Sequence, residues 1–191
     1  MKKAAMFGLD ARIALAIFGA LSVISGAALY SAIQQAKTVS IVAELNEAAK
    51  AIEAYMLDTG LDLVLDSTNY YYADLVDNTA ARSGWNGPYI AIPGELKGTG
   101  NRLYLDHPSY GNLLFRALES NIGGANYSHP TACTTAPCYY WIQLNGLEHE
   151  TVKNIDLYID GSLDDSAGRV RYIDISTNSV FIQGPIVLNQ P

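Results

Sequence analysis

The sequence predicts an α+β protein in which a long N-terminal helix packs its second half on a small antiparallel β-sheet. Three observations lead to this fold class. Residues 13–36 form an apolar run without a charged side chain, and an amphipathic helical pattern continues that run to about residue 58. Segments rich in β-branched and aromatic residues follow towards the C-terminus. The 191 residues are enough for one globular domain and an additional segment.

Composition removes several classes of protein. The chain has 49% hydrophobic and 16% charged residues and a formal charge of -7. An acidic chain with few basic residues offers no row of phosphate contacts, so nucleic acid is not expected as a main ligand. The apolar content is too high for intrinsic disorder. The mean hydropathy of +0.08 is raised by one segment, which excludes a protein with many membrane spans.

The apolar run at residues 13–36 is long enough to cross a membrane. At about 1.5 Å per residue, such a helix spans a hydrocarbon core of about 30 Å. Lys2 and Lys3 precede it, so we expect the basic end in the cytoplasm and the rest of the chain outside. A cleaved secretory signal is disfavoured, because its apolar core is shorter and ends at a cleavage site. A signal anchor that only tethers a periplasmic domain stays open.

The helix continues beyond the membrane-length run. Apolar residues recur at spacings of three and four, and Thr59-Gly60 supplies the residue types of a helix C-terminus. The apolar positions are Val42, Leu45, Ala49, Ile52 and Met56. We therefore expect one helix from about Asp10 to Asp58, roughly 70 Å long. Its second half can pack on a globular part, whereas its first half needs lipid or further copies of itself.

The remaining residues, 61–191, predict a globular α+β part. Gly, Asn and Pro clusters divide residues 61–137 and predict a long connector with one short helix at 112–119. Strands are expected at 139–144, 169–175 and 179–183, with a turn at 176–178 and a short helix within 147–159.

The order of these parts resembles type IV pilins and the pseudopilins of type II secretion. A short basic leader, an acidic residue, an apolar stem and the continuation EAAKAIEAYMLDTG carry the resemblance over about the first 60 residues. It implies that a prepilin peptidase removes the leader, that the new N-terminus is methylated, and that inner-membrane machinery assembles the stems into a helical filament. Residues 84–89 also resemble a Trp/Gly/Pro/Tyr turn whose ring packs on the stem helix in this family.

The family pattern can be fitted in two ways. A cut between Ala5 and Met6 gives a leader of residues 1–5, a helix of 6–60 and Asp10 as the fifth mature residue, where pilins usually have Glu. A cut between Gly8 and Leu9 gives a leader of residues 1–8 and places no acid fifth. We favour the first. The resemblance then implies that Asp10 pairs with the N-terminal ammonium of Met6 in a neighbouring subunit.

Asp10 has a second interpretation, because Asp also suits the start of a helix. Arg12 could neutralise it within one chain and so weaken the pairing between subunits. Elsewhere in the stem, Gly19, Ser22 and Gly26 are small, and the spacing of Ser22 and Gly26 lets helix backbones approach closely. We expect these residues to pack stems together, although small residues are common in any membrane helix.

Cys133 and Cys138 are the two cysteines of the chain, and outside the cytoplasm they are expected to form a disulfide that fixes the start of the strand at Tyr139. The carboxylates of Asp156, Asp160, Asp164 and Asp165 suit calcium, which some pseudopilins bind. Their spacing is not that of a known calcium loop. A solvated turn is therefore the favoured interpretation, with no cofactor expected.

No catalytic motif appears in the chain, and no enzyme activity is expected. His107, His129 and His149 lie singly, and each is expected on the surface or at a helix end. The sequence thus favours a homo-oligomeric structural subunit of a type IV pilus-like filament, anchored in the inner membrane before assembly and extracellular afterwards. A pseudopilin of a type II secretion system and a signal-anchored periplasmic binding or enzymatic domain are the alternatives.

Overall fold

The computed structural model describes residues 3–66, 69–70, 72–78, 80–92, 94–99, 102–118, 122, 133–173 and 178–191. Within these ranges the side chains of 3–7, 65–66, 69–70, 72, 99, 102–103 and 117–118 are left out. The chain forms two compact units, which we call the stem unit (Met1–Lys37) and the head unit (Thr38–Pro191). Helix α1, Lys3–Thr59, supplies the stem unit and the first part of the head unit.

Helix α1 ends where the sequence predicts and begins earlier than predicted, at Lys3 instead of about Asp10. Its C-terminus is closed by Gly60, which has a φ of 67° and donates its N–H to the carbonyl of Met56 at 2.9 Å. The Thr59 hydroxyl donates to the carbonyl of Tyr55 at 2.7 Å and accepts the N–H of Leu61 at 3.2 Å. Glycine adopts this left-handed conformation without steric cost, which explains the stop at residue 60.

The head unit contains a six-stranded sheet in which every neighbouring pair is antiparallel, in the order β3-β4-β5-β6-β8-β7. The fold class is therefore α+β, as predicted. The strands are β3 (Glu95–Thr99), β4 (Arg102–Asp106), β5 (Asn112–Leu118), β6 (Tyr139–Asn145), β7 (Val170–Ile173) and β8 (Ser179–Ile186). A separate ribbon pairs β1 (Leu65–Asp66) with β2 (Asn69–Tyr70), and a 3-10 turn, η1, covers Tyr72–Leu75.

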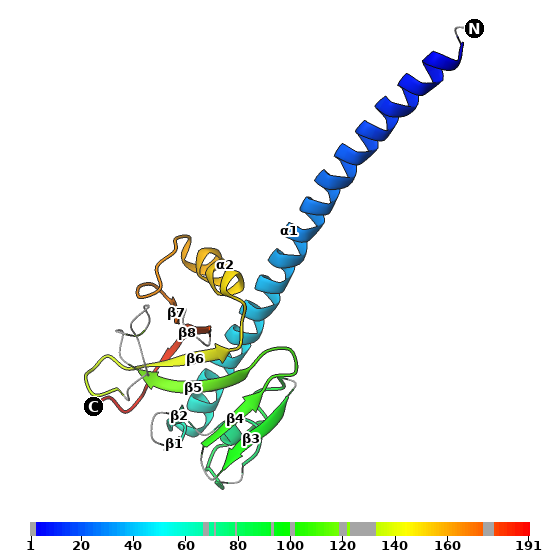
Figure 1. The fold of residues 1–191 in the computed structure, drawn as a ribbon. Helices are drawn as coiled ribbons and strands as arrows, with labels where there is room; N and C mark the ends of the chain where they lie inside the picture. The colour runs from blue at the N-terminus through cyan, green and yellow to red at the C-terminus, as the bar shows by residue number, and fades with distance from the viewer. Residues whose placement is uncertain are drawn as a thin grey trace. The chain divides into compact units, whose positions relative to one another are not determined.

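One face of the sheet packs on the second half of α1. Tyr140 and Ile142 of β6 join Leu45, Ile52 and Tyr55 of α1 in the main core, and all five are at most 1% exposed. Strands β5 and β6 cross this part of α1, and the β3–β4 hairpin continues the sheet beyond them (Figure 1). The amphipathic stripe predicted from the sequence is thus the face of α1 that lies in the core.

The other face of the sheet carries a second, smaller core. Trp141 of β6 and Phe181 of β8 alternate along their strands with residues of the main core and are completely buried. They pack with Ile122 and Ile173, which are 1% and 7% exposed. The guanidinium of Arg171 lies 5.2 Å from the centre of the Trp141 ring and donates to the carbonyl of Ile122 at 3.2 Å. The β6, β7 and β8 end of the sheet is therefore covered on both faces.

Two sequence expectations for the head unit were wrong. The helix expected at 112–119 is strand β5, because Leu113 and Phe115 pair with Leu144 and Ile142 of β6. The connector expected through 61–137 contains strands β3 and β4 as well. The strands expected at 139–144, 169–175 and 179–183 and the helix expected within 147–159 correspond to β6, β7, β8 and α2 (His149–Asp160). Most of the expected turn at 176–178 lies outside the described residues.

Candidate assembly site

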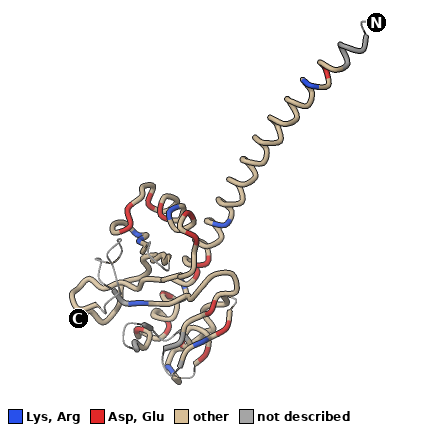
Figure 2. Tube along the Cα trace, in the orientation of Figure 1, with Lys and Arg blue, Asp and Glu red and all other residues tan. Residues whose placement is uncertain are grey.

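Among the described residues, the stem unit is a single helix with no second element on which its large apolar side chains could pack. Within residues 13–36, ten of them are 51–73% exposed. They are Ile13, Leu15, Ile17, Phe18, Leu21, Val23, Ile24, Leu29, Tyr30 and Ile33. Figure 2 shows the long uncharged stretch of α1 that these residues occupy. Among the described residues this is the one helix long and apolar enough to cross a membrane, a property that signal sequences share.

The residues predicted for processing and pairing lie in the first turns of α1. Gly8 and Leu9 are exposed, and the side chains of Ala5 and Met6 lie outside the described set. Asp10 and Arg12 are exposed, and no described ion pair joins them. Residues two apart on a helix point in different directions, so Arg12 is poorly placed to neutralise Asp10 within one chain.

Open space surrounds Gly19 and Gly26 in the stem unit. A Cβ atom added at Gly19 or Gly26 would meet no atom within 4 Å. The hydroxyl of Ser22 donates to the carbonyl of Phe18, one turn earlier, at 2.8 Å. This bond satisfies the hydroxyl within the helix, as is common for serine in apolar helices.

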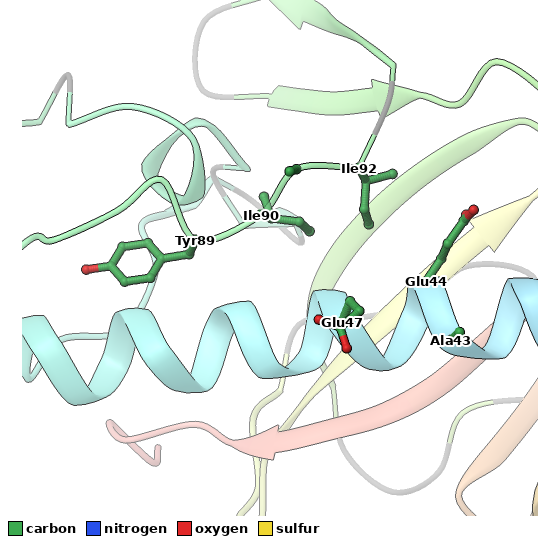
Figure 3. Close-up of a pocket in the computed structure, with 7 residues that line it drawn as sticks. Ala43, Glu44, Glu47, Tyr89, Ile90 and Ile92 are labelled. Atoms are coloured by element: carbon green, nitrogen blue, oxygen red, sulfur yellow. The ribbon is translucent and has the colours of Figure 1, made fainter.

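In the head unit, a groove of about 320 Å³ lies between α1 and the segment that follows Tyr89. One wall is apolar and is formed by Ile90, Ala91 and Ile92, and the α1 side presents Glu44 and Glu47. In Figure 3 the side chain of Ile92 points towards α1, and Glu44 extends from α1 towards the same segment. The groove therefore combines an apolar wall with two carboxylates.

Glu44 is held in place by a buried histidine. The Nε2 atom of His107 lies 3.0 Å from Oε2 of Glu44, and Nδ1 of the same ring accepts the N–H of Ser109 at 3.1 Å. Because Nδ1 is an acceptor, Nε2 carries the proton and donates it to the carboxylate. The ring of Tyr110 stacks on His107 at 4.9 Å. His107 is thus not the surface or helix-end residue that the sequence predicts.

The predicted Trp/Gly/Pro/Tyr turn lies beside the end of α1. The ring of Tyr89 packs edge-on against Tyr55 at 5.8 Å and against Trp85 at 5.6 Å. Its hydroxyl donates to Asp58 at 3.0 Å. Tyr89, more than Trp85, therefore makes the contact with the helix that the family resemblance implies.

A buried carboxylate lies beneath this turn. Asp74 is 1% exposed, and its nearest cation is Arg82, with Nε 3.8 Å from Oδ2. Burial raises the pKa of Asp74, and the charge of Arg82 opposes that shift only in part. The indole N–H of Trp85 donates to the Asp74 carbonyl at 2.7 Å, which joins the turn to η1.

Cys133 and Cys138 form the predicted disulfide, with Cα atoms 5.9 Å apart. The backbone of Cys138 also binds the C-terminal residues. Its N–H donates to the side-chain oxygen of Gln190 at 2.7 Å, and its carbonyl accepts the N–H of Val187 at 3.0 Å. The disulfide therefore fixes both the start of β6 and the end of the chain.

The acidic residues proposed for calcium accept backbone hydrogen bonds in and around the turn after α2. Asp156 is completely buried and accepts the N–H of Asp164 at 2.8 Å, and Asp160 accepts the N–H of Val170 at the same distance. Burial raises the pKa of Asp156, whereas hydrogen bonds from Ser166 lower the pKa of Asp164. Asp165 contributes its carbonyl to Tyr172. Calcium stays a prediction, and the described residues contain no group of three or more ligands placed to hold a metal ion.

Of the other two histidines, the structure describes His149. His149 is the first residue of α2 and lies 3.9 Å from Glu150, both largely exposed, whereas His129 lies outside the described residues. Comparison with protein-family models, curated proteins and solved structures finds no match to this chain. Any function must therefore be argued from the residues and their arrangement.

Proposed function

We propose that this chain is a structural subunit of a type IV pilus-like filament, held in the inner membrane by its stem before assembly and extracellular afterwards. In this proposal the protein performs no chemistry. Its stems leave the lipid and bundle into the core of the filament, and its heads form the outer wall. A prepilin peptidase and inner-membrane assembly machinery are its expected partners.

The observation that carries the proposal is the apolar stem, whose ten large side chains are at least half exposed. Burial of apolar surface contributes about 25 cal/mol per Å², so a helix of this kind in water would aggregate. Lipid or other stems can cover it. Its continuation in the same helix, α1, into a folded antiparallel head supports retention of the stem, whereas a discarded signal would not need this continuity.

Asp10 gives the proposal its most specific feature. A carboxylate among packed apolar stems costs several kcal/mol unless an opposite charge compensates it. Pairing with the N-terminal ammonium of Met6 in a neighbouring copy would supply that charge and would fix the register between stems. The first step of any test is thus the mature N-terminus, which mass spectrometry identifies directly.

The proposal predicts a mature chain that begins at a methylated Met6, or at a methylated Leu9 if the cut is later, and filaments visible by electron microscopy after shearing from cells. An intact Met1, or a secreted form without residues 13–36, would refute it. Long surface filaments would favour a pilus over the short periplasmic structure of a secretion system.

The pairing of Asp10 is tested by two matched variants. Asp10→Ala removes the charge and should reduce filament yield while the head unit keeps its unfolding midpoint. Asp10→Glu keeps the charge on a longer side chain and should retain filaments. Equal yields from all three proteins would show that the carboxylate is dispensable.

A further inference from the structure

The head-unit groove joins an apolar wall to two carboxylates that the fold itself only partly uses. Glu44 has a 34% exposed side chain and uses Oε2 for His107. Glu47 has a 65% exposed side chain and contacts Lys50 at 2.9 Å, and the lysine is 68% exposed. A surface pair of this kind contributes about 0–1 kcal/mol, so Glu47 can change partners at little cost.

The shape and chemistry of the groove fit one long basic side chain. A volume of about 320 Å³ is too small for a folded segment and large enough for a side chain or two. Lysine buries its methylene carbons against apolar residues and keeps its ammonium in a polar environment. Here Ile92 and Ala91 would contact the methylenes, Glu44 would contact the ammonium, and Glu47 would add its negative charge at longer range.

Helix α1 contains a basic residue, Lys37, close to the groove along the helix axis. Lys37 is the only charged residue between Arg12 and Glu44. It lies about 10 Å along the helix from Glu44 and about 15 Å from Glu47, at about 1.5 Å per residue. Side chains pair within a helix only at three or four residues, so Lys37 cannot reach either carboxylate of its own helix.

We infer that Lys37 of a second copy of this chain docks in the groove between Glu44 and Ile92. This inference rests on the proposed function, because it needs stems that run parallel. Lys37 also has an interaction within its own chain, and an ammonium with three N–H donors can serve two acceptors at once.

The contact explains why assembly would continue beyond a pair. Lys37 and the groove are different surfaces at different positions along α1. Each copy can therefore place its Lys37 in the groove of one neighbour and hold the Lys37 of another neighbour in its own groove. A contact of this heterologous type that does not close into a ring generates an open filament. The pairing of Met6 with Asp10 requires a stagger of four residues in the same direction. With that stagger, Lys37 of one copy lies about 4.5 Å along the helix axis from Glu44 of its neighbour. This distance is within the roughly 6 Å reach of a lysine side chain.

Cysteine crosslinking tests the contact in assembled filaments. The Lys37→Cys, Ala43→Cys double variant places thiols on the stem and on an exposed groove residue. Within one chain these positions are about 9 Å apart along α1, too far for a disulfide, which requires Cα atoms within about 7 Å. Oxidised filaments should therefore give a ladder of covalent multimers on a non-reducing gel. The matched Lys37→Cys, Lys50→Cys variant, with positions about 20 Å apart along the helix, should give none.

Charge exchange provides a second measurement if Lys37→Cys itself impairs assembly. Lys37→Glu would place three carboxylates together and should lower filament yield about tenfold or more. The double variant Lys37→Glu, Glu47→Lys should recover yield to within about twofold of the original protein. Both variants should unfold at the same urea concentration as the original chain, which would place the defect in assembly.

The outcomes separate this inference from the proposed function. Filaments that form without a ladder from residues 37 and 43, or a Lys37→Glu defect that Glu47→Lys fails to relieve, would overturn the docking of Lys37 and leave the filament role intact. Failure of the original chain to form filaments would overturn both.

Discussion

Asp62 joins the end of α1 to the C-terminal residues, and its replacement tests how the head unit is held together. One oxygen accepts the hydroxyl of Tyr140 at 3.0 Å and the N–H of Leu188 at 2.9 Å. The other accepts the backbone N–H and the side-chain amide of Asn189 at 2.8 Å and 2.7 Å. The Tyr140 hydroxyl in turn accepts the N–H of Leu63 at 3.1 Å. Asp62→Ala would therefore remove four hydrogen bonds at one position.

The expected cost follows from the burial of the partners. The three bonds to residues 188 and 189 are exposed and should contribute about 0.5 kcal/mol each. Tyr140 is completely buried, and leaving its O–H without an acceptor costs about 1–3 kcal/mol. We expect Asp62→Ala to lower the free energy of unfolding by about 3 kcal/mol, which corresponds to a fall in Tm of roughly 6–12 °C for a unit of this size. Asp62→Asn, which keeps one oxygen, should lose about half as much.

Urea unfolding of the full chain in a nonionic detergent measures this loss. The two tryptophans of the chain, Trp85 and Trp141, both lie in the head unit, so their fluorescence reports that unit alone. A double-mutant cycle with Tyr140→Phe should give a coupling of about 1 kcal/mol, because the two groups share a hydrogen bond. A loss under about 1 kcal/mol for Asp62→Ala would refute the assignment of Asp62 as the link.

Three further predictions concern the turn after α2, the turn at Gly84 and the stem. Burial raises the pKa of Asp156 above its usual value of 3.8, so its ionised form destabilises the folded state at neutral pH, and this effect disappears as the pH falls to that value. Asp156→Asn should therefore be more stable than the original protein at pH 7, with an advantage in urea unfolding that shrinks towards pH 4; a constant difference would contradict this. Gly84 has a φ of 81°, and an added Cβ would overlap the backbone of Asp58, so Gly84→Ala should lower Tm far more than Gly60→Ala, whose Cβ would meet nothing within 4 Å. Comparable melting curves for the two alanine variants would argue against this close approach. Gly19→Leu should leave the unfolding of the head unit unchanged and reduce filament yield, and normal filaments would show that stems do not pack closely at this residue.

Periodicity predicted the parts of the fold that have long or strongly patterned segments. The stripe of Leu45 and Ile52 identified the buried face of α1, and the aromatic and β-branched residues of β6 identified a strand. Thr59-Gly60 identified the end of the helix, because only a glycine-like conformation closes it there. These signals are local, so a single sequence contains them.

Strands β3, β4 and β5 carry weak signals in the sequence, and β5 depends on a partner, β6, that lies far away along the chain. Leu113 and Leu114 are good helix formers, and the short apolar run that they make with Phe115 fits either period. Pairing with β6 decides in favour of a strand. The polar sequence of β3, with Lys97 and Gly98, gives no clear alternation. Tertiary pairing, more than propensity, forms this half of the sheet.

Candidate site residues were predicted in the stem and not in the groove, and those in the stem stay predictions. Asp10 and the small stem residues could be named from the order of parts in the sequence. Glu44 gave no signal, because its partner His107 is 63 residues away and a single histidine has no pattern. The apolar segment at Ile90 and Ile92 likewise acquires meaning only when it lies across α1.

The second, smaller core of the sheet restricts which residues of this protein can be substituted. Trp141 and Phe181 are buried there while their neighbours along β6 and β8 are buried on the opposite side, so β6 and the first half of β8 expose almost no side chain to solvent. Substitutions should therefore be tolerated better at the exposed residues of β3 than in β6 and the first half of β8.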